Sequence, residues 1–143
     1  FKDLNGLHPE RIVNQTNGVT PRRWLKTCNP QLANVVTDVI EEVTIQLDKA
    51  LAAGIKRENI ILDPGIGFAK DAEHNWEIID SIDSFVDLGY PILIGASRKR
   101  FLGGDSPDER EQATIDLTKR LATTGVWAVR VHSVKPHKEV LAQ

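Results

Sequence analysis

Polar and charged side chains recur at three points in this chain, each close to the end of a short apolar run. They are Asp63, then Ser97, Arg98 and Lys99, then Arg130 and His132. Arg offers a bidentate fork, Lys a point charge and His a donor, so this set could bind a phosphate or pyrophosphate. A carboxylate could accept hydrogen bonds from an amino-substituted ring. The sequence therefore suggests a site for a ligand that has both an anionic end and an amino-substituted end.

The spacing of these residues predicts the element that positions them. Asp63 and Ser97 are 34 positions apart, and Ser97 and Arg130 are 33 apart. This distance fits successive strand–helix units of about 30 residues. Helical crossovers imply a parallel sheet, whose strand ends meet at one edge. We therefore expect an α/β fold, a partial (β/α) barrel with about three parallel strands, preceded by a helical or irregular N-terminal segment.

Apolar periodicity and turn residues give the expected elements. Strands are expected at 59–63, 92–95 and within 126–134, where apolar and β-branched residues cluster. Helices are expected from Asn29-Pro30 to Gly54, over 78–86 up to Gly89, after a capping box at 106–109, and near Pro136. Gly65 and Gly67 let the loop after Asp63 bend and a ligand approach its backbone.

Each of these residues also has an ordinary structural interpretation. An Asp-Pro pair at a strand end is common in turns, and a Ser-Arg-Lys stretch is common in solvated loops. A His at a strand end is often a hydrogen-bonded structural group. Three polar clusters at equivalent positions favour the binding site over three separate coincidences.

Composition restricts the class of protein. The chain has 143 residues, 41% hydrophobic and 27% charged, with a net charge of −2. This balance gives no sign of a nucleic-acid-binding protein. The single Cys28 cannot form an internal disulfide, and neither a membrane span nor a signal peptide is visible. We expect a cytoplasmic protein that acts on small molecules.

Three stretches, "ILDPGIGFAK…HN", "YPILIGASRKRFLG" and "VWAVRVHSV", resemble the last three strand-end motifs of dihydropteroate synthases. The resemblance covers residues 36–143, in order and with matching spacing. It implies a (β/α)8 barrel and a transferase of folate biosynthesis. Such an enzyme joins p-aminobenzoate to 6-hydroxymethyl-dihydropterin diphosphate and releases pyrophosphate.

The resemblance also implies roles for single residues. Asp63 and Lys99 would bind the pterin, Phe68 would line the pocket near the aminobenzoate, and Ser97 would support the Lys99 loop. Arg130 would stack on the pterin and hold the leaving pyrophosphate together with His132. The family uses Mg²⁺, but its ligand, an Asn on the first strand, has no recognisable counterpart here.

Residues 1–35 fit this family poorly. The stretch "LHPERIVNQTNGVTPRRWLKTCNPQLA" resembles a segment of α-glucan (glycogen) phosphorylases, in which the residue matching Asn17 touches the glucosyl unit. We interpret the chain as two parts, a phosphorylase-like segment at 1–35 and a pterin-binding half-barrel at 36–143. A glucan-related role of the first part is one alternative function, and a non-catalytic pterin- or anion-binding module is another.

Three strands with their helices cannot close a barrel, which takes about 250 residues. We therefore expect an open sheet edge and an apolar sheet face, covered by residues 1–35, by a second copy of the chain, or by a partner half-barrel. As an isolated enzyme the chain should be weak or inactive.

Overall fold

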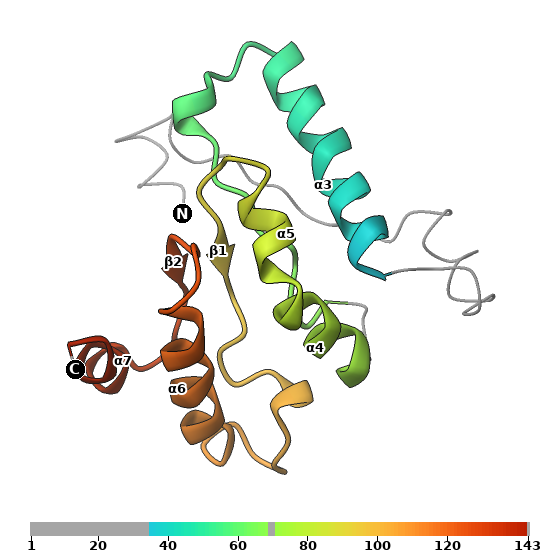
Figure 1. Ribbon diagram of the computed structural model, residues 1–143. Helices are drawn as coiled ribbons and strands as arrows, with labels where there is room; N and C mark the ends of the chain where they lie inside the picture. Colours follow the sequence, from blue (N-terminus) through green and yellow to red (C-terminus); the bar gives the residue numbers. More distant parts are fainter. Residues whose placement is uncertain (1–34, 69–70, 143) are drawn as a thin grey trace.

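The computed structural model describes residues 35–68 and 71–142, and Figure 1 shows their arrangement around a small parallel sheet. The helices and strands are α3 (Val35–Ala52), α4 (Ala72–Asp80), α5 (Ile82–Val86), β1 (Leu93–Ile94), α6 (Arg110–Leu121), β2 (Ala128–Val129) and α7 (Val134–Leu141). Short 3-10 turns lie at Arg57–Asn59 and Arg100–Leu102. None of the helices in these ranges is long and apolar enough to cross a membrane.

The sheet is parallel, as predicted, but its strands are shorter. In β1 and β2, Leu93 pairs with Ala128 and Ile94 with Val129. The segment before Asp63 joins the other side of β1 through one parallel bridge, Leu62 to Ile92. The expected strand at 59–63 is reduced to this bridge, because Asn59 lies in a 3-10 turn and Pro64 has no N–H to donate.

Helix α3 has the expected periodicity. Its buried residues are Val36, Val39, Val43, Leu47 and Ala50, spaced three or four apart on one face of the helix. The helix stops before Gly54, which has a φ of +85° and so takes the left-handed conformation that favours glycine. The predicted start at Asn29-Pro30 lies outside the described residues.

The helix predicted over 78–86 is divided into α4 and α5. Ser81 separates them with φ −104° and ψ 24°, outside the helical region, and both Ile78 and Phe85 remain buried. Asp71 caps α4, since its carboxylate accepts a hydrogen bond from the His74 N–H at 2.8 Å. The break lets two short helices turn their apolar faces to the same core.

The predicted capping box precedes α6 with changed geometry. Ser106 Oγ accepts from the Glu109 N–H at 3.3 Å, but the Glu109 carboxylate accepts from the Asp105 N–H at 2.9 Å. The helix itself begins only at Arg110. Helices α6 and α7 pack on each other below β2 (Figure 1).

The two faces of the sheet differ in burial. Ile92 and Ile94 are 0% and 1% exposed and pack against the helices. Ile61 alternates with Leu62 along the chain and is 47% exposed, and Trp127 at the start of β2 is 61% exposed. Among the described residues, Ile61 and Trp127 thus expose apolar side chains next to the strands, and an open apolar sheet face stays a prediction.

Candidate functional site

The predicted site residues follow the ends of three parallel segments. Asp63 comes directly after Leu62, Lys99 lies in the turn after β1, and Arg130 follows β2. Because the segments run in the same direction, these residues share one edge of the sheet. The charges of both Asp63 and Arg130 act on the Lys99 ammonium group, so the three side chains lie close together.

Asp63 is half-buried and shapes its own loop. One carboxylate oxygen accepts a hydrogen bond from the Gly65 N–H at 2.8 Å, which forms an Asx turn. The loop then carries Phe68, whose side chain is 51% exposed. The turn interpretation of Asp63 is therefore compatible with a binding role, because the turn fixes the direction of the carboxylate.

Lys99 is half-buried, and its side chain lies against Gly67 and Phe68. Its Nζ lies 3.7 Å from the centroid of the Phe68 ring, a cation–π contact. Burial lowers the pKa of Lys99 most, the positive charge of Arg130 lowers it further, and the Asp63 carboxylate raises it in part. Lys99 therefore holds its proton less tightly than an ordinary surface lysine.

Ser97 connects the loop after β1 to the loop after β2. Its buried Oγ lies 2.9 Å from His132 Nδ1 and accepts from the His132 N–H at 3.2 Å. We expected Ser97 to support the Lys99 loop. That role stays a prediction, and the contacts of its hydroxyl also join it to His132, so that the ends of the two strands are connected.

Arg130 and His132 lie beyond the end of β2, although we expected a strand within 126–134. β2 ends at Val129, and the last sheet-like bond runs from the Arg130 N–H to the Ile94 carbonyl at 2.9 Å. Strand alternation therefore does not place them. The backbone bond positions Arg130, and the Ser97 contact positions His132.

Residues 8–132 match the sequence profile of a family described as pterin binding enzyme. The chain belongs to the pterin-binding enzyme family. It is 40% identical over 121 residues to a dihydropteroate synthase of Mycobacterium leprae, covering 78% of this chain and 43% of that protein. It is 39% identical over 114 residues to one of Streptococcus pyogenes, covering 76% and 43%. The chain thus spans less than half the length of these curated relatives.

Solved structures of this pterin-binding family agree in fold. Dihydropteroate synthase from Xanthomonas albilineans in complex with 7,8-dihydropteroate matches with a TM-score of 0.75 and 29% identity, over 79% of this chain and 45% of that one. The enzyme from Thermus thermophilus in complex with 4-aminobenzoate gives a TM-score of 0.72 and 36% identity, over 76% and 43%. The described residues thus form part of a TIM-barrel fold.

Within this pterin-binding chain, sequence reasoning missed the role of Arg98. The ordinary structural interpretation of Arg98 was a solvated loop residue, but Arg98 Nε donates to Glu111 Oε2 at 2.7 Å and a terminal nitrogen donates to Ser133 Oγ at 2.9 Å. Its backbone has a φ of +57°, uncommon outside glycine, and its N–H donates to Thr114 Oγ1. Arg98 therefore ties the loop after β1 to α6 and to the start of α7.

Asn75 was also missed. Its side chain is 1% exposed, its Oδ1 accepts from the Gly67 N–H at 2.6 Å, and its Nδ2 donates to the Asp71 carbonyl at 2.5 Å. The helix predicted over 78–86 did not include Asn75, but its position three and four residues before Ile78 and Ile79 places it in line with the apolar face of that helix. Asn75 fixes the loop that carries Phe68.

The described residues do not fit a magnesium site. No group of three His, Cys, Asp or Glu side chains in 35–68 and 71–142 could hold a metal ion. At the sheet edge, the carboxylate of Asp63 shares its surroundings with two cations, Lys99 and Arg130. Asn17 and the phosphorylase-like segment lie outside the described residues, except for Val35, so their roles stay predictions.

Proposed function

We propose that this chain carries the pterin- and pyrophosphate-binding half of a dihydropteroate synthase. The observation that supports the proposal most is the meeting of Asp63, Lys99 and Arg130 at one sheet edge, in a chain that is similar to such synthases. The reaction would join p-aminobenzoate to 6-hydroxymethyl-dihydropterin diphosphate. Complexes of similar enzymes with 7,8-dihydropteroate and with 4-aminobenzoate support these substrates.

In this proposal each residue contacts a different part of the substrates. The Asp63 carboxylate accepts hydrogen bonds from the pterin ring, and Lys99 binds the same ring from the turn after the neighbouring strand, β1. Arg130 stacks on the pterin and, with His132, holds the diphosphate. Phe68 lines the place of the aminobenzoate, and Ser97 keeps His132 in position.

The chemistry is a nucleophilic displacement. The amino nitrogen of p-aminobenzoate attacks the methylene carbon of the pterin, a C–N bond forms, and the C–O bond to the diphosphate breaks. The electron pair of that bond leaves on pyrophosphate, and the nitrogen loses one proton to solvent. Cations near the departing diphosphate stabilise its growing charge. We assign no step to a metal ion, since the described residues offer none a site.

Two alternatives remain from the sequence. A non-catalytic binding module would use the same residues without turnover. A glucan-related role would depend on Asn17. A second copy or a partner half-barrel would supply the remaining walls of the site, because Ile61 and Trp127 leave apolar surface exposed on the sheet.

Ligand-induced melting tests the proposal. A ligand that binds the folded state raises the melting temperature. We expect 6-hydroxymethyl-dihydropterin diphosphate to raise it and a glucan oligomer to leave it unchanged. Asp63→Asn is the matched variant, because its amide oxygen can still accept from the Gly65 N–H while the charge is lost. If the pterin diphosphate still raises the melting temperature of both Asp63→Asn and Lys99→Ala by as much as it does in the parent chain, the proposed site is contradicted.

A further inference from the structure

Two glycines lie directly against the two cations of the site. A Cβ added at Gly95 would lie 2.7 Å from a terminal guanidinium nitrogen of Arg130, 3.3 Å from its Nε and 3.4 Å from its Cζ. A Cβ added at Gly67 would lie 2.7 Å from Cδ of Lys99, 3.0 Å from its Cγ and 3.2 Å from its Cε. Non-bonded carbons pack at about 3.5–4.0 Å. Each cationic side chain therefore occupies space that any other residue type would fill.

Gly95 matters for its lack of a side chain and not for its backbone conformation. It is absent from the glycines with positive φ, so its backbone conformation suits other residues. The Arg130 N–H is bonded to the Ile94 carbonyl, which fixes the Arg130 backbone beside the end of β1. From there the guanidinium lies against the Gly95 backbone, with three of its atoms within 3.4 Å of the place of a Cβ.

Gly67 does the same for Lys99. The stem of Lys99 crosses Gly67, and its Nζ then reaches the Phe68 ring. The Gly67 N–H is itself held by Asn75 Oδ1 at 2.6 Å, so the backbone under the stem is fixed. Gly67 also has a φ of +76°, so a substitution there adds backbone strain to the contact.

Two like charges separate unless something confines them. Arg130 lowers the pKa of Lys99, which shows that the two cations interact unfavourably. We propose that Gly95 and Gly67 are positioning residues, whose bare backbones hold the Arg130 guanidinium and the Lys99 stem in place for one ligand. The inference rests on the proposed function only in taking that ligand to be the pterin substrate, with Lys99 at its ring and Arg130 at its diphosphate.

Inorganic pyrophosphate, titrated by calorimetry into the full chain, tests Gly95. Gly95→Ala should keep the fold, because it needs no change in φ and meets only the flexible end of Arg130. We expect the affinity of Gly95→Ala for pyrophosphate to fall roughly 10- to 100-fold, which is what the loss of one charge-assisted hydrogen bond typically costs. In an Arg130→Ala background the same change should cost nothing further. Unchanged affinity in Gly95→Ala, or an equal loss in both backgrounds, would overturn the role of Gly95.

Proton NMR of the Lys99 side chain tests Gly67 without any ligand. The Phe68 ring should shift the Lys99 Hε resonances upfield, and Gly67→Ala should abolish that shift. Gly54→Ala is the matched control, with a φ of +85° and nothing within 4 Å of its Cβ. If Gly67→Ala keeps the upfield shift, or if Gly54→Ala loses it equally, the role of Gly67 is refuted.

A second measurement tests the same contact if the Gly67→Ala variant folds poorly. If the new Cβ meets Lys99, then Lys99→Ala should recover part of the melting temperature that Gly67→Ala loses, and no recovery would refute the contact. A chain that binds no pyrophosphate at all would contradict the proposed function. The ligand-free spectra and the melting rescue would still decide whether Gly67 positions Lys99.

Discussion

Arg130 and Arg98 follow neighbouring strands, yet their side chains have different neighbours. Arg98 is bonded to Glu111 and Ser133, whereas the Arg130 guanidinium lies against the Gly95 backbone, and its charge acts on Lys99. We expect Arg130→Ala to weaken pyrophosphate binding about tenfold or more, the worth of one charged hydrogen bond. Arg98→Ala should weaken it less. Titration calorimetry on both variants decides, and equal losses or a larger loss in Arg98→Ala would count against the site.

Asn75 is expected to matter for stability as well as for the loop. Asn75→Ala removes the acceptor of the Gly67 N–H and one of two hydrogen bonds to the Asp71 carbonyl, which still accepts from the backbone N–H of residue 75 at 3.3 Å. An unsatisfied buried group costs about 1–3 kcal/mol, so the free energy of unfolding should fall by that order. Urea denaturation measures it. Asn59→Ala, at a half-buried position in a 3-10 turn, is the control and should change stability little; a comparable loss there would remove the special role of Asn75.

At the scale of the residue, the sequence predicted which side chains gather but not what each one touches. Asp63, Lys99 and Arg130 were found because strand ends recur at regular intervals. Arg98 and Asn75 were missed because their partners, Glu111 and Gly67, are chosen by tertiary packing. Nothing in the local sequence distinguishes an arginine that binds a helix from one that binds solvent.

The contact between the β1 loop and α6 depends on the charge of Glu111. The hydrogen bond from Arg98 is the main cause that lowers the pKa of Glu111, with smaller effects from Ser133 and His137, and burial acts in the opposite direction. A carboxyl group with a lowered pKa stabilises the fold above its unfolded pKa, about 4.3. That contribution is lost as pH falls through the lower folded pKa.

We therefore expect Glu111→Gln to lower the melting temperature at pH 7 and to have a progressively smaller effect as pH falls below the unfolded pKa and through the lowered folded pKa of Glu111, because the parent carboxylate then also takes up a proton. Thermal melts between pH 7 and pH 3 measure the difference. Glu77→Gln, on the exposed side of α4, is the control. A difference between parent and Glu111→Gln that does not depend on pH would show that the Arg98 pair is not its source.

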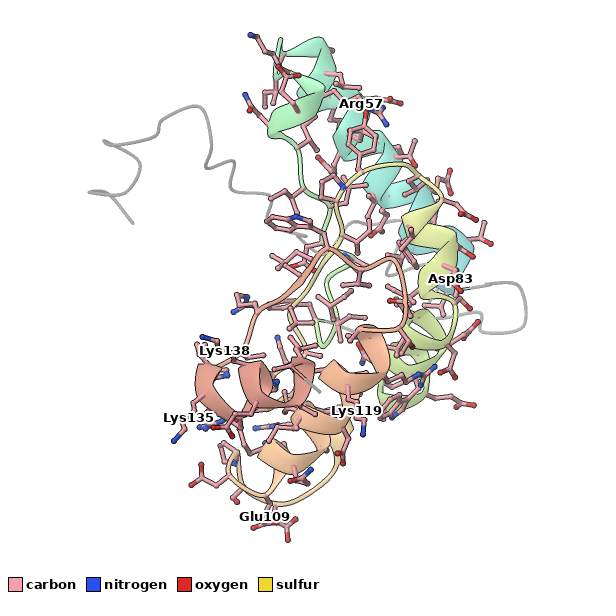
Figure 2. All side chains as sticks on the ribbon, turned by 60° about the vertical axis from the view of Figure 1, so that its left-hand side comes forward. Arg57, Asp83, Glu109, Lys119, Lys135 and Lys138 are labelled. Atoms are coloured by element: carbon pink, nitrogen blue, oxygen red, sulfur yellow. The ribbon has the colours of Figure 1, made fainter. Side chains whose placement is uncertain are left out.

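The elements themselves were predicted in type and order, and their bounds less well. The period of α3 came directly from its apolar residues. The break at Ser81 was not visible, because the apolar period continues through it and only packing separates α4 from α5. The strands came out shorter than their apolar runs, since pairing depends on the neighbouring segment. Figure 2 shows Lys135 and Lys138 pointing outward from α7, as expected for charged residues of a surface helix.

At the scale of the whole molecule, the part of the chain that the structure describes buries Ile92 and Ile94 and leaves Ile61 and Trp127 exposed. We expect the 143-residue chain by itself to be a weak or inactive synthase. Arg130 is exposed and Lys99 is half-buried, so water would screen their charges. Loss of one electrostatic contact to the leaving group typically costs about 10²–10³ in rate. Two substrates also need rigid walls for alignment.

A coupled assay with p-aminobenzoate, the pterin diphosphate and Mg²⁺ measures this activity. A single dihydropteroate synthase of full length, assayed in parallel, is the reference. Turnover near the enzyme median of about 10 s⁻¹ would show that the described residues, together with 1–34, supply more of the site than we infer.

The lowered pKa of Lys99 should make this lysine react selectively with acylating reagents. A lysine that gives up its proton more easily carries more free amine at mildly alkaline pH, so an acylating reagent should tag it early. Its neighbours should tune the rate in opposite directions. Arg130→Gln removes a charge that lowers the pKa and should slow tagging, whereas Asp63→Asn removes one that raises it and should speed tagging. Mass spectrometry of the labelled peptide would thus report, from one amine, which of its two charged neighbours is still in place.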